Sequence, residues 1–182
     1  MRVFKIYICL ILFSFVWMRN IHSNNENFYN KRGHSKIDLL HSNINSTVLN
    51  IEVDDYELEE VIFENKNFYR IKIDNGTPIL SKGNPDLPKL STSIIIPNNK
   101  NMKIEVISSE YKEINNINVI PSKGNLSRDV NPEDIPFIYS EAYNKNEFYP
   151  NEIALLGNPY ILRDVRGQSV IINPIQYNPA TK

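Results

Sequence analysis

The chain has 182 residues, of which 41% are hydrophobic and 23% are charged, and its formal net charge is −1. This composition predicts one globular domain with a substantial core and excludes a largely disordered chain. A net charge near zero provides no electrostatic basis for binding nucleic acid, so we expect no such partner.

An apolar leader opens the chain. Arg2 and Lys5 precede or border an uninterrupted apolar run over residues 6–18, and polar residues begin directly after it. The run is shorter than the about 20 residues that a membrane-spanning helix needs, and its length is typical of a signal peptide. We therefore predict residues 1–23 to be a signal peptide that ends at Ser23, and a secreted or cell-surface location. The alternative is an uncleaved segment, which would then be the only contact with a membrane.

The single cysteine, Cys9, lies inside this apolar run. A chain that has lost residues 1–23 would have no disulfide and no thiolate nucleophile. His34 and His41 stand in a polar stretch without the partners or the spacing of a metal site. The sequence therefore predicts no catalytic residue, no metal and no other cofactor, and no enzyme activity for this chain alone.

Residues 24–46 are polar and rich in asparagine, which predicts a flexible polar leader. The folded domain is expected over residues 47–182. In residues 68–73, Tyr69, Ile71 and Ile73 alternate with Arg70 and Lys72, a period of two that is typical of a half-buried strand. Similar patterns predict strands over residues 48–53, 58–63, 91–96, 102–107, 111–120, 152–156, 160–165 and 168–174, with a hairpin turn over residues 64–67.

No stretch of ten or more residues carries a helical stripe of apolar residues. The predicted fold class is therefore all-β, an antiparallel β-sandwich of the jelly-roll type. Residues 121–151 interrupt the strands with four prolines and several aromatic residues. A connection this long inside one domain is usually functional or packed by its own side chains.

One short segment carries a recognisable motif. Residues 83–88 read GNPDLP, and the strand-like segment 94–98 reads IIIPN. By itself the first segment also fits a rigid connector between strands, because its two prolines fix two backbone φ angles. Further short motifs follow at residues 106–110, 121–124, 134–136, 149–154, 161–168 and 176–179. Each is weak alone, but their order over residues 47–182 resembles the propeptide of gingipain-type (family C25) cysteine peptidases.

The resemblance implies a jelly-roll-like β-sandwich that acts as intramolecular inhibitor and folding aid of a secreted cysteine endopeptidase. The expected partner is the catalytic domain of that C25-type protease, in cis or in trans. The family's catalytic cysteine and histidine have no counterpart here. The alternative is a stand-alone secreted or surface β-sandwich that binds a partner without any protease. The family motif rests chiefly on Gly83, Pro85, Leu87 and Pro88.

The resemblance also implies that the loop over residues 123–132 crosses the active-site cleft of the protease. A basic residue from this loop is expected to occupy the pocket that reads the substrate side chain. Arg128 is the only arginine in the loop and is the first candidate, with Lys123 as the second. Leu126 and Val130 are expected to pack beside it on the cleft. The alternative is a solvated Arg128 that pairs with Asp129.

Overall fold

A computed structural model describes residues 1–11 and 35–182, and most of its regular structure is β-strand. Within these residues no helix has the length and apolar character needed to cross a membrane. The elements, in chain order, are β1 (Arg2–Ile11), β2 (Ser35–Ser42), β3 (Ser46–Val53), β4 (Glu57–Phe63), β5 (Lys66–Lys72), β6 (Thr77–Pro78), β7 (Pro88–Ile95), β8 (Glu105–Glu113), η1 (Pro132–Asp134), η2 (Glu141–Asn144), β9 (Ala154–Leu162), β10 (Val165–Ile172) and β11 (Ile175–Gln176).

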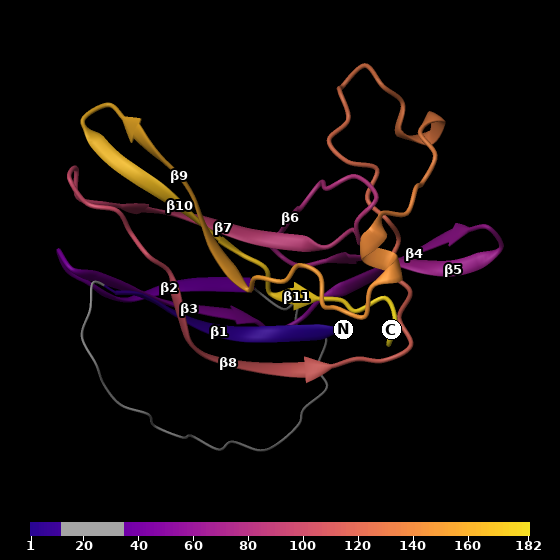
Figure 1. Cartoon of the computed structure of the whole chain (residues 1–182), viewed down its shortest axis with the longest axis horizontal. Coiled ribbons are helices and arrows are strands. Elements are labelled where there is room, and N and C mark those ends of the chain that lie inside the picture. Colours follow the sequence, from indigo (N-terminus) through magenta and orange to yellow (C-terminus); the bar gives the residue numbers. More distant parts are fainter. Residues whose placement is uncertain (12–34) are drawn as a thin grey trace.

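The strands form two layers and a separate hairpin (Figure 1). One sheet has the order β11–β1–β3–β2, with β8 paired to the other edge of β1. The second sheet has the order β6–β7–β10–β9, and β4 and β5 form a two-stranded sheet of their own. All pairs between these strands are antiparallel. The prediction of an all-β, antiparallel fold is confirmed.

The core lies where the two layers face each other. Ile51 of β3 in one sheet and Val170 and Ile172 of β10 in the other are fully buried and belong to the same apolar cluster. Their spacing follows the period of two expected for strands with one buried face. Burying such a side chain contributes about 1.5–3 kcal/mol, so this face-to-face contact provides the main stabilisation of the domain.

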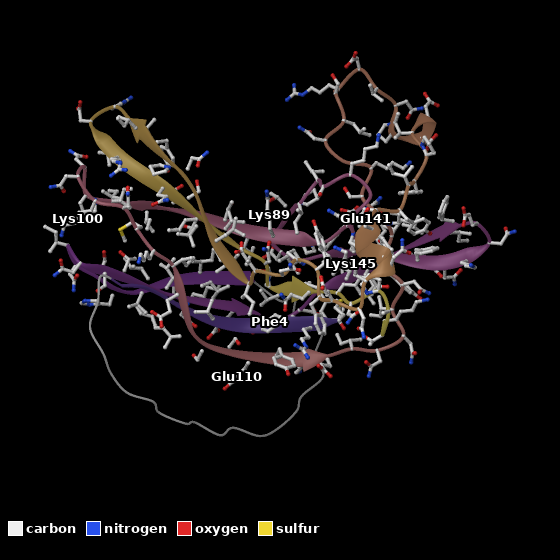
Figure 2. The ribbon with its side chains drawn as sticks, in the orientation of Figure 1. Phe4, Lys89, Lys100, Glu110, Glu141 and Lys145 are labelled. Carbon is white, nitrogen blue, oxygen red and sulfur yellow. The ribbon has the colours of Figure 1, made fainter. Side chains whose placement is uncertain are left out.

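The first residues of the chain lie inside the fold, which differs from the expectation that they stand apart from it. β1 pairs with β3 from Ile6↔Ile51 onwards and with β8 from Arg2↔Glu113 onwards. Phe4, which Figure 2 labels in the lower layer, is only 3% exposed. Apolar residues rich in β-branched and aromatic side chains satisfy the pattern of a signal peptide and that of a buried strand equally. Cleavage of residues 1–23 stays a prediction, and residues 12–23 lie outside the described residues.

The prediction that residues 24–46 form a flexible leader is wrong for the second half of this segment. Residues 24–34 lie outside the described residues, but Ser35–Ser42 forms β2 and pairs with β3. The turn between them is closed by Asn43, whose side-chain oxygen accepts hydrogen bonds from the backbone amides of Asn45 and Ser46 at 2.7 and 2.8 Å. A polar edge strand has no complete apolar face, so its pattern does not separate it from a flexible segment.

Several predicted strands also have different limits in the structure; the one expected over residues 102–107, for example, forms only from Glu105 onwards, as the start of β8. Residues 111–120 do not form one strand, because β8 ends at Glu113 and only an isolated bridge, Tyr69↔Val119, continues the pairing. The predicted strand over residues 160–165 is interrupted by the turn between β9 and β10, where Arg163 has φ +55°. In the last two places the residue types still favour a strand, but residue type alone does not report where the backbone turns or loses its partner.

Removal of β1 provides a test of its role in the sheet. A chain that begins at Asn24 leaves the facing edges of β3 and β8 unpaired, and unpaired edges associate with other chains. We expect this chain to stay β-rich but to unfold at lower urea concentration than the full chain and to associate at high concentration. Urea unfolding followed by circular dichroism, together with sedimentation velocity, measures both effects. A monomer as stable as the full chain would show that β1 is dispensable.

Candidate functional site

A long loop, residues 123–139, projects away from both sheets (Figure 1). We refer to these residues as the projecting loop. It contains η1 and is followed directly by η2, and none of its residues belongs to a strand. Glu141 and Lys145, both labelled in Figure 2, lie in and beside η2 at the foot of the loop. The loop therefore stands on a short helical turn rather than on a sheet edge.

The family motif holds both ends of the projecting loop. The backbone N–H of Gly83 donates to the Ser122 carbonyl at 2.8 Å, and the Gly83 carbonyl accepts from the Ser140 N–H at 2.8 Å. The Ser122 N–H donates to the Asn84 carbonyl at 2.7 Å. The Ser140 hydroxyl adds a hydrogen bond to the side-chain oxygen of Asn84. Residues about forty to sixty positions apart thus form one platform beneath the loop.

The residue types of the motif follow from this geometry. Gly83 has φ +81°, and a Cβ atom built on it would lie 3.1 Å from the Ser140 nitrogen. Pro85 forms an isolated bridge with Pro121, and Leu87 is 1% exposed in the core. Pro88 is buried and begins β7. The segment is a rigid connector, as its prolines indicated, and it is also the anchor of the loop.

Arg128 lies at the outer turn of the loop. The Val130 N–H donates to the Ser127 carbonyl at 3.1 Å, which places Arg128 and Asp129 at the centre of a turn. Among the described residues the exposed Arg128 guanidinium has neither a hydrogen bond nor an ion pair. Asp129 instead accepts a hydrogen bond from the Ser127 hydroxyl, which lowers the pKa of its carboxyl. The alternative pairing of Arg128 with Asp129 is not formed.

Lys123 is engaged at the neck of the loop. Its ammonium donates to the Pro132 carbonyl at 2.6 Å and lies 4.3 Å from the centroid of the Phe137 ring. Leu126 and Val130, the two predicted apolar contacts, are half-buried. The structure therefore brings the four predicted loop residues into one projecting segment but separates the two basic side chains, with Lys123 at the neck and Arg128 at the turn.

The foot of the loop contains residues that the sequence analysis did not identify. The Tyr143 hydroxyl donates to the Val119 carbonyl at 2.8 Å, and burial raises the pKa of this phenol. The Tyr143 ring meets the Tyr139 ring edge-on at 4.9 Å between centroids. The only sequence signal for this cluster was the number of aromatic residues in the proline-rich stretch.

Within residues 1–11 and 35–182, no three histidine, cysteine, aspartate or glutamate side chains gather as a metal site would require. What the loop presents is a positively charged side chain on an anchored, otherwise hydrogen-bonded turn.

Comparison with known proteins identifies the family of the chain. The profile of the family Propeptide_C25 matches residues 27–182. Gingipain R2 of Porphyromonas gingivalis is 50% identical over 107 residues, which are 59% of this chain and 14% of that protein. Lys-gingipain of the same species is 26% identical over 129 residues, 67% of this chain and 7% of that protein. The chain thus spans only a small part of the length of these curated relatives.

Two solved structures share the fold. A complex of the pro- and mature domains of RgpB from Porphyromonas gingivalis matches with a TM-score of 0.77 and 39% identity, covering 80% of this chain and 75% of the other. A structure that addresses the zymogenic latency of gingipain K matches with a TM-score of 0.60 over 73% and 76% of the two chains. At 23% identity the second match shows the fold alone.

The all-β fold and these matches define a propeptide-type domain, and the chain belongs to the C25 propeptide family. The resemblance that the sequence motifs indicated is confirmed. Propeptide domains of this family are non-catalytic, so the prediction that this chain is not itself a peptidase is confirmed as well.

Substitution Gly83→Ala tests the platform. Because a non-glycine residue at φ +81° is strained and its Cβ would press on Ser140, we expect a loss of about 1–2 kcal/mol in the free energy of unfolding. Gly157→Ala is the control for the backbone strain, since Gly157 lies in a strand without a positive φ, while its added Cβ would also meet a neighbour, Ser169 Cβ, at 3.3 Å. Urea denaturation measures both variants. Equal stability of the two would contradict the anchoring role of Gly83.

The raised pKa of the Tyr143 phenol predicts that the stability of the domain falls at alkaline pH. Its raised pKa means that the folded state keeps the proton at a pH where the unfolded chain, with an ordinary tyrosine pKa near 10, has lost it. Stability is therefore full below about pH 10 and falls as the pH rises above it. Denaturation at pH 8 to 11 should show a smaller alkaline loss for Tyr143→Phe than for the wild-type chain. An identical loss in both would exclude Tyr143 as its source.

Proposed function

We propose that this chain is the inhibitory propeptide of a C25-type cysteine endopeptidase precursor, and that the projecting loop blocks the active-site cleft of that protease. The observation that carries the proposal is the position of Arg128 on a loop whose two ends are fixed. Arg128 is exposed, and its side chain makes no hydrogen bond or ion pair with the described residues. A preorganised loop loses little conformational freedom when it docks, so more of its contact energy appears as affinity.

Arg128 is the residue proposed to enter the pocket that reads the substrate side chain. Its guanidinium can meet a carboxylate through two parallel hydrogen bonds, a geometry that lysine cannot reproduce. Lys123 would first have to give up its 2.6 Å hydrogen bond to Pro132 and its contact with Phe137. The half-buried Leu126 and Val130 flank the turn and would pack on the walls of the cleft.

The proposed partner is the catalytic domain of the same precursor, in cis or in trans. One structural relative is a complex of pro- and mature domains, which supports a domain–domain contact of this kind. We further propose that the domain assists folding of the protease. We also propose that residues 1–23 direct export of the chain, so that it is secreted or located at the cell surface. The apolar run over residues 6–18 and the sequence similarity to gingipains support this proposal.

Inhibition by single variants tests the assignment. We expect Arg128→Ala to raise the inhibition constant against the mature peptidase of its own precursor by about thirtyfold or more, the cost of removing a central arginine worth roughly 2 kcal/mol. Lys123→Ala is measured beside it, together with the thermal stability of each chain.

The outcomes separate the possible roles. An inhibition constant for Arg128→Ala within about threefold of wild type would refute the pocket assignment. The same large loss in Lys123→Ala alone would assign the pocket to Lys123. If only deletion of residues 122–131 matters, the loop acts by covering the cleft. A wild-type chain without any inhibition would favour the stand-alone binding module.

A further inference from the structure

The neck of the projecting loop is closed by a single side chain. Lys123 reaches across nine positions to donate to the Pro132 carbonyl at 2.6 Å, and its ammonium lies over the face of the Phe137 ring at 4.3 Å. A cation in this position is attracted by the electron density of the ring face. Lys123 thereby ties the start of the loop to two points near its end, and the turn that bears Arg128 lies between these points.

Phe137 is in turn fixed by the hairpin of β4 and β5. Its ring meets the Phe63 ring edge-on, with centroids 5.1 Å apart and an angle of 65° between the planes. Phe63 is the last residue of β4 and also contacts the rings of Phe68, at 6.0 Å, and Tyr139, at 6.4 Å. Edge-on aromatic pairs contribute more to stability than their buried area alone would give. Phe63 therefore stabilises the position of Phe137 and, through it, of the loop.

The hairpin itself is fastened to the platform. The Arg70 guanidinium of β5 bonds to Asp86 at 2.9 Å and to Glu59 of β4 at 3.0 Å. The Tyr69 N–H donates to the Asn118 carbonyl at 2.7 Å. The contact of Phe137 with Phe63 therefore joins the loop to a hairpin that is itself bonded to the rest of the domain.

The hairpin contributes Ile71 of β5 to the main apolar cluster, and Phe68 of β5 is also buried. β4 and β5 belong to neither large sheet, and the main apolar cluster contains neither Phe63 nor Phe137. Ile62, the neighbour of Phe63 on β4, is 75% exposed. The end of the hairpin with Phe63 is thus directed at the loop rather than at the core.

We propose that Lys123, Phe137 and Phe63 form a brace, and that Phe63 is a positioning residue that holds Arg128 for insertion into the protease cleft. The brace explains why an outlying hairpin ends in a phenylalanine directed at a loop that lies some sixty to seventy-five positions further along the chain. This inference rests on the proposed inhibitory function, and it assigns Lys123 to the loop's own structure instead of to the protease pocket.

The test compares three full-length variants of the hairpin. Phe63→Ala removes the ring, Phe63→Tyr keeps it, and Ile62→Ala is the matched control on the exposed side of the same strand. We expect Phe63→Ala to raise the inhibition constant against the mature peptidase of its own precursor by about tenfold, through added freedom of the loop. Phe63→Tyr should restore inhibition, and Ile62→Ala should match wild type.

A second readout follows the loop without the peptidase. The rate at which trypsin cuts after Arg128 under native conditions, followed by mass spectrometry, should rise severalfold in Phe63→Ala, because a freer loop is cut faster. An unchanged rate in Phe63→Ala, or an equal rise in Ile62→Ala, would overturn the brace. Faster cutting with unchanged inhibition would also overturn it, since the order of the loop would then not matter for binding.

A double-mutant cycle separates this inference from the proposed function. If Phe63 acts through Arg128, Phe63→Ala should cause no further loss of inhibition in a chain that already carries Arg128→Ala. Full additivity of the two losses would refute action through Arg128. If Arg128→Ala alone has no effect, the pocket assignment fails. Faster trypsin cutting together with weaker inhibition in Phe63→Ala would then still support the brace as a device that orders the loop.

Discussion

Four hydrogen bonds between Gly83–Asn84 and the two ends of the projecting loop, at Ser122 and Ser140, are the interactions on which the presented site depends. A long connection without such closure would sample many conformations, and ordering it on docking would consume most of the binding energy. Here the ordering is completed during folding. Only a glycine allows the backbone of residue 83 to serve both ends at once, because its φ is positive and the Ser140 backbone lies against it.

The platform is continuous with the buried core. Leu87 and Leu90, which follow the motif into β7, are almost fully buried between the two sheets. Asp86 connects the same segment to the hairpin through Arg70. The anchor of the loop and the core of the sandwich therefore share one continuous segment of chain.

The two basic residues of the loop differ in the contacts that they make within the domain. The compact ammonium of Lys123 can approach a carbonyl and an aromatic face at once, and both contacts are made within the domain. The broad guanidinium of Arg128 stays exposed on a turn that Ser127, Asp129 and Val130 close without it. Within residues 1–11 and 35–182, Lys123 thus has a role in the structure of the loop, whereas the Arg128 side chain makes no hydrogen bond or ion pair.

Local patterns in the sequence determined the all-β fold class and the hairpin. Apolar residues such as Ile71 and Ile73 recur with a period of two, and this period indicates a strand with one buried face. The rigid motif at residues 83–88, the loop and its basic residues were also visible in the sequence, through prolines, glycines and the likeness to a propeptide family. The pairing of Gly83 with Ser140 and the contact of Phe63 with Phe137 were decided only by tertiary structure, since nothing local specifies a partner more than fifty positions away. The same holds for β1. Its apolar sequence indicates that the segment avoids water, but only the packing of the whole chain decides that it forms a strand between β3 and β8.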